Sequence, residues 1–165
     1  VGVTPSGSRL CLLGVFRGWL PVWSGWFKAA MSRRSRAREV VLQVLYQDDL
    51  NPDSLHSVTD DFLTSRLLGD AELIAFARSL LAGVRSQRAS LDTVLETHTE
   101  NWQLSRMAAT DRNVLRLAAF EILHADTPGP VVIDEAVELA RRFGARQSSQ
   151  FVNGVLDRVL RESLK

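Results

Sequence analysis

The feature of this sequence that most constrains its fold is a helical spacing of apolar residues that recurs from Met31 to the C-terminus. The segment 111–125 is apolar on almost every side, through Val114, Leu115, Leu117, Ala118, Ala119, Phe120, Ile122 and Leu123. A surface helix would show a single apolar stripe, so this helix is expected at the centre of the domain. No segment alternates with period two, and no βαβ pattern is present. The sequence therefore predicts an all-α fold.

Other segments keep the same spacing on one face. The expected helices are 32–49, 57–68, 71–84, 91–97, 131–143 and one from about Ser149, with a short connecting helix at 102–107. The expected N-caps are Ser32, Asp70 and Thr110, and the glycines expected to close helices are Gly69 and Gly144. These elements amount to a bundle within residues 31–165.

The segment 1–30 lacks this spacing and holds three of the four tryptophans. Its apolar run, Leu10 to Phe16, is interrupted by Arg17, so no uninterrupted span of about 18 residues is available for a membrane helix. We interpret residues 1–30 as a non-native or disordered extension, with the true start at Met31. A targeting segment and a functional tail are the alternatives.

The charge of the domain is close to balanced. Residues 1–30 hold three of the 20 basic residues and none of the 19 acidic ones, so residues 31–165 carry 17 basic residues against 19 acidic ones. A domain that binds nucleic acid through charge alone is usually clearly basic. RNA binding by this domain would therefore need a local basic patch, a basic partner, or both.

The sequence shows no catalytic or metal-binding pattern. His56, His98 and His124 lie far apart, and none has a ligand spacing. Cys11 is the only cysteine, so neither a disulfide within the chain nor a cysteine-based zinc site is possible. Glycine-rich phosphate loops are also missing. We therefore expect a cytoplasmic binding protein that is not an enzyme and needs no cofactor or metal.

Four arginines occupy the six positions that open the first helix. In a helical projection, Arg36 and Arg38 fall on opposite flanks of the apolar stripe. Arg33 and Arg34 precede the apolar run, so we expect them to extend beyond the core and face solvent. Cations are unfavourable at a helix N-terminus, so this cluster suggests a use other than stability.

Tyr46, the only tyrosine, lies about 180° from the apolar stripe, on an outer face that also carries Arg36, Glu39 and Gln43. An exposed aromatic ring beside guanidinium groups can stack an unpaired base while the arginines hold phosphates. The pattern alone leaves three interpretations open. They are an RNA site, a solvated helix start with Tyr46 packed by a loop, and a protein interface.

Three stretches together resemble the NusB family of bacterial transcription antitermination factors. They are RSRARE at 34–39 with QVLY at 43–46, TDRNVLRLAAFEIL at 110–123, and IDEAVELARRFG at 133–144 with FVNGVLD at 151–157. The similarity spans essentially all of 31–165. One departure is Arg146-Gln147, which stands before Ser148 where family members commonly carry acidic residues.

The resemblance implies a compact bundle of about seven helices. It also implies binding to the boxA element of ribosomal RNA transcripts together with NusE, a small-subunit ribosomal protein, and read-through of terminators by RNA polymerase. The RNA-binding residues expected from the cluster and the resemblance are Arg33, Arg34, Arg36, Arg38, Tyr46 and Phe151. A protein-interaction adaptor, or a relative of the N-terminal domain of ribosomal RNA cytosine methyltransferases, is the alternative.

Overall fold

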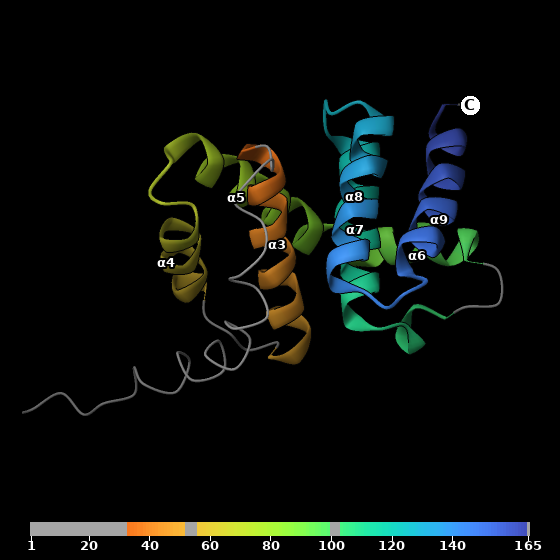
Figure 1. Cartoon of the computed structure of the whole chain (residues 1–165), viewed down its shortest axis with the longest axis horizontal. Helices are drawn as coiled ribbons and strands as arrows, with labels where there is room; N and C mark the ends of the chain where they lie inside the picture. Colours follow the sequence, from red (N-terminus) through yellow and green to blue (C-terminus); the bar gives the residue numbers. More distant parts are fainter. Residues whose placement is uncertain (1–32, 52–55, 100–102, 165) are drawn as a thin grey trace, which may run out of the picture. The chain divides into compact units, whose positions relative to one another are not determined.

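Helix α7 (Ala109–His124) is the element against which most of the others pack in this computed structural model (Figure 1). The structure describes residues 33–51, 56–99 and 103–164. Within that part, α7 contacts five other helices, α3 (Arg33–Leu50), α5 (Ala71–Ser86), α6 (Arg88–His98), α8 (Gly129–Phe143) and α9 (Ser148–Ser163). Buried residues lie on several sides of α7, as its apolar surface predicts.

The prediction of an all-α bundle is confirmed. The described residues contain seven α-helices and no strand, the remaining α-helix being α4 (His56–Arg66), and a short 3₁₀ helix, η1, lies at Leu104–Arg106. The predicted extension 1–30 and the predicted cap Ser32 lie outside the described residues. The chain divides at this point into two units, Val1–Ser32 and Arg33–Lys165, and only the second is described below.

The predicted start is right for α5, where a side chain caps the helix, and too late for α6, α7 and α8. Asp70 caps α5, since its carboxylate accepts a hydrogen bond from the Leu73 amide at 3.2 Å. Thr110 does not cap α7, because the helix begins at Ala109 and its N-cap position is Ala108. Helix α8 begins at Gly129 rather than at Val131, since a proline is tolerated in the first turn of a helix.

The two glycines expected to close helices do so for different reasons. Gly69 follows α4 with a φ of 71°, in the left-handed region that favours glycine. Gly144 has an extended backbone instead, with φ −91° and ψ −175°. A Cβ at Gly144 would lie 2.5 Å from the Ser148 Cβ and 2.6 Å from the Asp111 Oδ1. Gly144 is therefore required for space, where the start of α9 packs against the start of α7.

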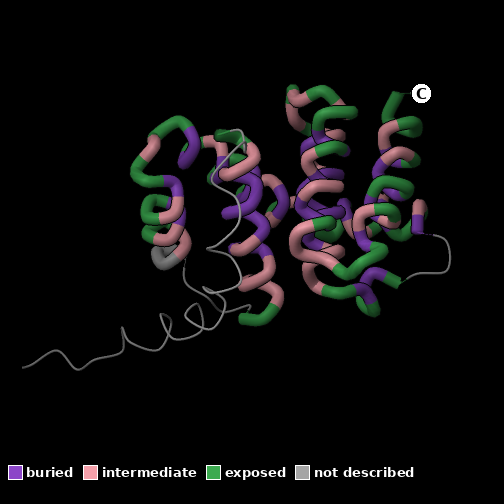
Figure 2. The backbone as a smooth tube through the Cα atoms, in the orientation of Figure 1, coloured by how far each residue is buried: buried purple, intermediate pink, exposed green. Residues whose placement is uncertain are grey.

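Helix α3 is buried more widely than its apolar stripe predicts (Figure 2). The predicted stripe is buried as expected, through Ala37, Val40, Val41, Val44 and Leu45. Leu42 and two charged residues, Arg38 and Glu39, are buried as well. The start of α3 is thus surrounded on several sides, and this burial decides which of its arginines can face a ligand.

None of the helices described is long and apolar enough to cross a membrane.

Candidate nucleic-acid interface

The four arginines at the start of α3 have four different environments. Arg33 and Arg34 are exposed, Arg36 is partly exposed, and Arg38 is buried. The exposure therefore falls along the helix as the chain enters the core. Three of these side chains pair with carboxylates, each from a different place in the sequence.

Arg38 lies in the core. Its guanidinium donates two hydrogen bonds to Glu121 of α7, from Nε to Oε1 at 2.8 Å and from Nη2 to Oε2 at 2.6 Å. The Arg38 and Glu121 side chains are only 4% and 1% exposed. Burial alone would lower the pKa of Arg38, but the hydrogen bonds and charge of Glu121 raise it above its usual value. The projection predicts Arg38 on a flank of the apolar stripe, and in the structure that flank is buried. We therefore leave Arg38 out of the proposed interface.

Arg33 is exposed, as predicted, and pairs with Asp70, the N-cap of α5. The hydrogen bond to Asp70 raises the pKa of Arg33 and lowers the pKa of Asp70. Glu72 lies 4.0 Å from the same guanidinium. This ion pair connects the start of α3 to the start of α5. Because it is exposed to solvent, it contributes little to stability.

Arg36 pairs with a buried carboxylate that two helices share. Its Nη1 donates to Glu39 Oε1 at 2.9 Å, while Arg142 of α8 donates from Nη1 to Glu39 Oε2 at 3.2 Å. The Glu39 side chain is almost fully buried, whereas Arg36 remains 41% exposed. Glu39 thus holds two guanidinium groups at one edge of the α3 and α8 contact, and part of Arg36 still faces solvent.

Arg34 differs from the other three because its contact is with a ring. Its guanidinium carbon lies 5.1 Å from the centroid of Phe76 on α5. Arg38 lies over the same ring, with its guanidinium carbon 5.3 Å from the centroid. Within the part of the chain that the structure describes, Arg34 makes no salt bridge with a carboxylate. Its positive charge is therefore available to an anion outside the chain.

The outer face predicted for α3 is packed at Glu39, while Arg36, Gln43 and Tyr46 remain partly exposed. Ser35 donates a hydrogen bond to Glu135 of α8 at 2.6 Å, and Glu39 pairs with Arg142, seven residues further along α8. Side chains of α8 thus reach the first half of α3 at two points. The expectation that Glu39 faces solvent is wrong for this reason.

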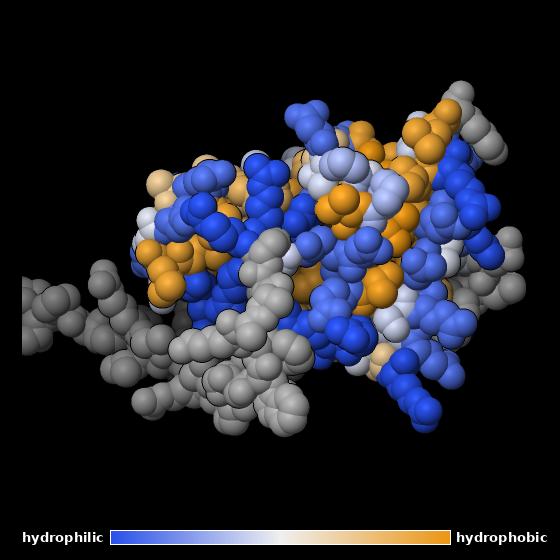
Figure 3. Space-filling view, turned by 45° about the horizontal axis from the view of Figure 1, so that its top comes forward, coloured by the Kyte–Doolittle hydropathy of each residue, from blue (hydrophilic) through white to orange (hydrophobic). Residues whose placement is uncertain are grey.

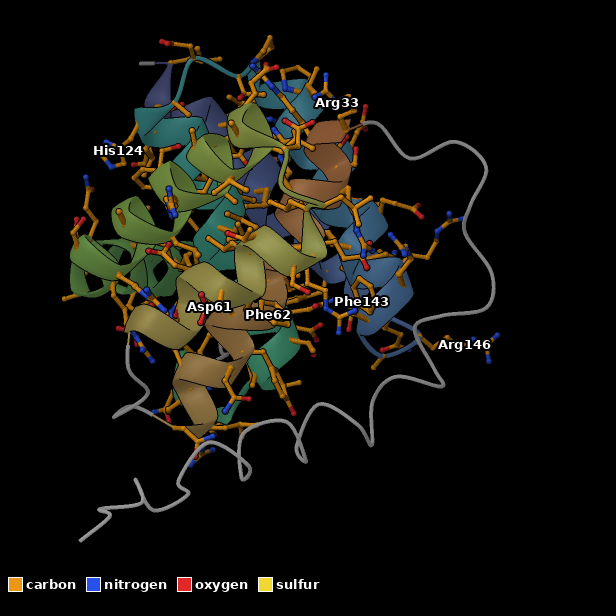
Figure 4. All side chains as sticks on the ribbon, turned by 90° about the vertical axis from the view of Figure 1, so that its left-hand side faces the viewer. Arg33, Asp61, Phe62, His124, Phe143 and Arg146 are labelled. Atoms are coloured by element: carbon orange, nitrogen blue, oxygen red, sulfur yellow. The ribbon has the colours of Figure 1, made fainter. Side chains whose placement is uncertain are left out.

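The other predicted residue, Phe151, lies in the first turn of α9, just after the turn that follows α8. Ser148 donates to Asp111 at 2.7 Å and accepts a hydrogen bond from the Ala145 amide at 2.8 Å, which fixes the start of α9. Arg146 is exposed and projects away from the ribbon beyond the end of α8 (Figure 4). Phe151 packs against the core and remains partly exposed. A basic and an aromatic side chain therefore stand near this fixed turn.

The surface has no single dominant apolar area on the face drawn in Figure 3, where hydrophilic side chains separate several hydrophobic ones. Among the described residues, no group of three or more His, Cys, Asp or Glu side chains is placed to hold a metal ion. The arrangement is suited to holding an extended anion through separate guanidinium groups and half-exposed rings.

Sequence reasoning missed three side chains that shape this surface, Phe76, Glu121 and Arg142. Phe76 lies off the apolar stripe of α5, and an aromatic residue in that position was the available signal. Glu121 and Arg142 lie on other helices, and the local sequence does not predict that these helices contact α3. Their contacts with α3 span 83 and 103 residues.

Comparisons with known proteins agree on one family. Residues 35–161 match the family model described as the NusB family. A relative from Anaeromyxobacter dehalogenans, the transcription antitermination protein NusB, is 46% identical over 128 residues, which cover 78% of this chain and 90% of the relative. The structure of T. maritima NusB superposes with a TM-score of 0.72 and 34% identity, over 81% of this chain and 94% of that one.

A third similarity concerns the fold alone. A chain in the crystal structure of the antitermination factors NusB and NusE in complex with dsRNA is 22% identical, with a TM-score of 0.72, over 81% of this chain and 99% of that one.

Proposed function

Since the chain belongs to the NusB family, we propose that it acts as a transcription antitermination factor that binds boxA-type RNA of ribosomal RNA transcripts together with NusE. In this role it promotes read-through by RNA polymerase. The proposed RNA-binding surface consists of Arg33, Arg34, Arg36 and Tyr46 on α3, with Phe151 on α9.

The observation that carries this proposal is the state of Arg34. It is exposed, it lies at the start of a helix where a cation is unfavourable, and no carboxylate of the described chain neutralises it. An RNA phosphate would supply the missing negative charge. Arg36 and Arg33 would add contacts at the cost of loosening their present carboxylates.

The aromatic residues support the same function. Tyr46 and Phe151 are both partly exposed, and each partly exposed ring can stack an unpaired base. A stack of this kind contributes about 1–3 kcal/mol per base. The surface therefore combines groups for phosphates with groups for bases, as single-stranded RNA binding requires.

The near-balanced charge of residues 31–165 is the reason to expect a basic protein partner in RNA binding. Residues 31–165 carry 17 basic residues against 19 acidic ones, so the domain as a whole does not attract RNA. A basic partner would supply the missing electrostatic attraction. A solved complex of relatives contains NusB, NusE and RNA, which supports NusE as that partner.

The test is fluorescence anisotropy with a labelled boxA-like single-stranded RNA, with and without NusE, over a series of salt concentrations. We expect tighter binding in the presence of NusE. Arg34→Ala should weaken binding and reduce the salt slope by roughly 0.7 to 1, the loss of about one phosphate contact.

The matched control is Arg66→Ala. Arg66 also lies over an aromatic ring, that of Phe62 at 5.2 Å, but both residues belong to α4. This variant should leave both affinity and slope unchanged. No RNA binding in either condition would favour a protein-interaction adaptor, and an unchanged slope for Arg34→Ala would exclude Arg34 as a phosphate contact.

A further inference from the structure

Two guanidinium groups of α3 that have different freedom lie close to the ring of Phe76. Arg38 is fixed by its two hydrogen bonds to Glu121. Arg34 contacts the same ring and is otherwise exposed. A chain of contacts thus runs from a buried carboxylate of α7, through Arg38 and Phe76, to the surface guanidinium.

This arrangement gives Phe76 a property that an ordinary surface residue lacks. Phe76 packs against the hydrophobic core and is only partly exposed, so its ring has a fixed place. A long arginine side chain in solvent samples many rotamers, and ordering it costs free energy when a ligand binds. A fixed ring beneath the guanidinium reduces that cost.

The contact with the ring also leaves the hydrogen-bonding capacity of Arg34 intact. Among the described residues, the Arg34 side chain donates no hydrogen bond and makes no salt bridge besides its contact with the ring. Its N–H donors therefore remain available to a phosphate. Arg33 and Arg36 differ, since each would have to exchange a carboxylate for the phosphate.

We propose that Phe76 is a positioning residue for RNA binding, which holds the guanidinium of Arg34 in place for a phosphate without occupying its donors. The inference deepens the proposed function and rests on it. It assigns a role to α5, from which neither the sequence pattern nor the resemblance supplied an RNA-binding residue.

The experiment is a double-mutant cycle on RNA affinity, measured by anisotropy with the boxA-like RNA in the presence of NusE. Phe76→Leu should weaken binding about two- to five-fold, the range of a surface cation–π contact. Phe76→Tyr, which keeps the ring, should bind like the wild type. In the Arg34→Ala background, Phe76→Leu should cause no further loss, because the side chain that it positions is missing.

Matched variants separate positioning from general damage. Phe76→Met lacks the ring but fills a similar volume, and it replaces Phe76→Leu in the cycle if the leucine variant does not fold. Phe62→Leu removes the ring beneath Arg66 on α4 and should leave RNA affinity unchanged. Thermal melts accompany every variant.

Two results would overturn the inference. One is unchanged affinity for Phe76→Leu and Phe76→Met while Arg34→Ala still weakens binding. The other is the same loss with and without Arg34, which would show a structural effect alone. Failure of the proposed function is distinguishable, because Arg34→Ala itself would then have no effect.

Discussion

The two ends of α3 carry opposite charges, and both oppose the helix dipole. The first turn contains arginines and no acid, while the last turn contains Asp48 and Asp49 and no base. Each end is neutralised by other helices. At the start the partners are Asp70 of α5, Glu121 of α7 and Glu135 of α8, and at the end they are Arg85 of α5, Arg88 of α6, and Arg112 and Arg116 of α7.

The ends differ in how completely they are neutralised. The Asp49 side chain is 4% exposed and pairs with Arg88 at 2.6 Å, Arg112 at 2.8 Å and Arg116 at 3.4 Å. The side-chain amide of Asn113 donates a further hydrogen bond to it at 3.0 Å. At the start of α3, Arg34 has no carboxylate partner within the described residues. Protein groups thus neutralise the C-terminal end of α3, which we call the closed end. The N-terminal end, which we call the open end, leaves the charge of Arg34 for an anion outside the chain.

Asp49→Ala should break the closed end and have the largest effect. It leaves Arg88 and Arg112 without their carboxylate, while Arg116 keeps Asp92 at 2.6 Å. Removing one partner from a buried ion cluster costs about 3–5 kcal/mol. Urea unfolding measures the loss. Asp60→Ala is the control, because Asp60 pairs with Arg78 in solvent and should change stability by less than about 1 kcal/mol. Equal losses for both would refute the contrast.

Glu121→Ala should come next, with a loss of about 3 kcal/mol. The loss is smaller because Glu135 remains 3.9 Å from Arg38 and compensates part of its charge. Replacing both partners, as in Arg38→Met with Glu121→Leu, should recover most of the stability, since no unpaired charge is left buried.

That double variant also tests the place of Arg38 in RNA binding. If Arg38 is structural, the stable double variant keeps the salt slope of the wild type. A slope lower by about one would show instead that Arg38 contacts a phosphate.

Acid should weaken the closed end of α3. Burial opposes ionisation of Asp49, but Arg112, with the charges of Arg116 and Arg88, outweighs it and lowers the pKa of Asp49 below its usual value. A carboxylate with a lowered folded pKa contributes stability above its unfolded pKa, about 3.9, and loses it as the pH falls through the folded pKa.

The measurement is urea unfolding of the wild type and Asp49→Asn at several pH values. The difference in unfolding free energy between them should be constant near neutral pH and shrink below about pH 4. A difference that persists unchanged at pH 2–3 would show that the charge of Asp49 does not stabilise the fold.

The sequence predicts much of the helical framework, because the apolar spacing that defines a helix is local. It also predicts that Arg33 and Arg34 face solvent, since they precede the apolar run. The burial of Arg38 could not be predicted in this way. Its position on the helix allows either solvent or core, and the choice depends on Glu121, which lies 83 residues away. The burial of Glu39 was missed for the same reason, since its partner Arg142 lies 103 residues away.

The smallest expected effect concerns the exposed ion pair between Arg33 and Asp70 at the open end. Asp70 both caps α5 and neutralises Arg33. Asp70→Asn keeps the cap, because asparagine is as good an N-cap as aspartate, but it removes the charge. Only Glu72, 4.0 Å from the Arg33 guanidinium, would then compete with an RNA phosphate. RNA affinity at low salt should rise roughly two-fold, since an exposed ion pair contributes little.

The rise should disappear in the Arg33→Ala background, where there is no cation to release. It should also shrink at high salt, which screens the Asp70 charge in the wild type as well. A gain that survives without Arg33 would mean that Asp70 repels the RNA directly. The open end of α3 would then be limited by a nearby carboxylate rather than by competition for one of its arginines.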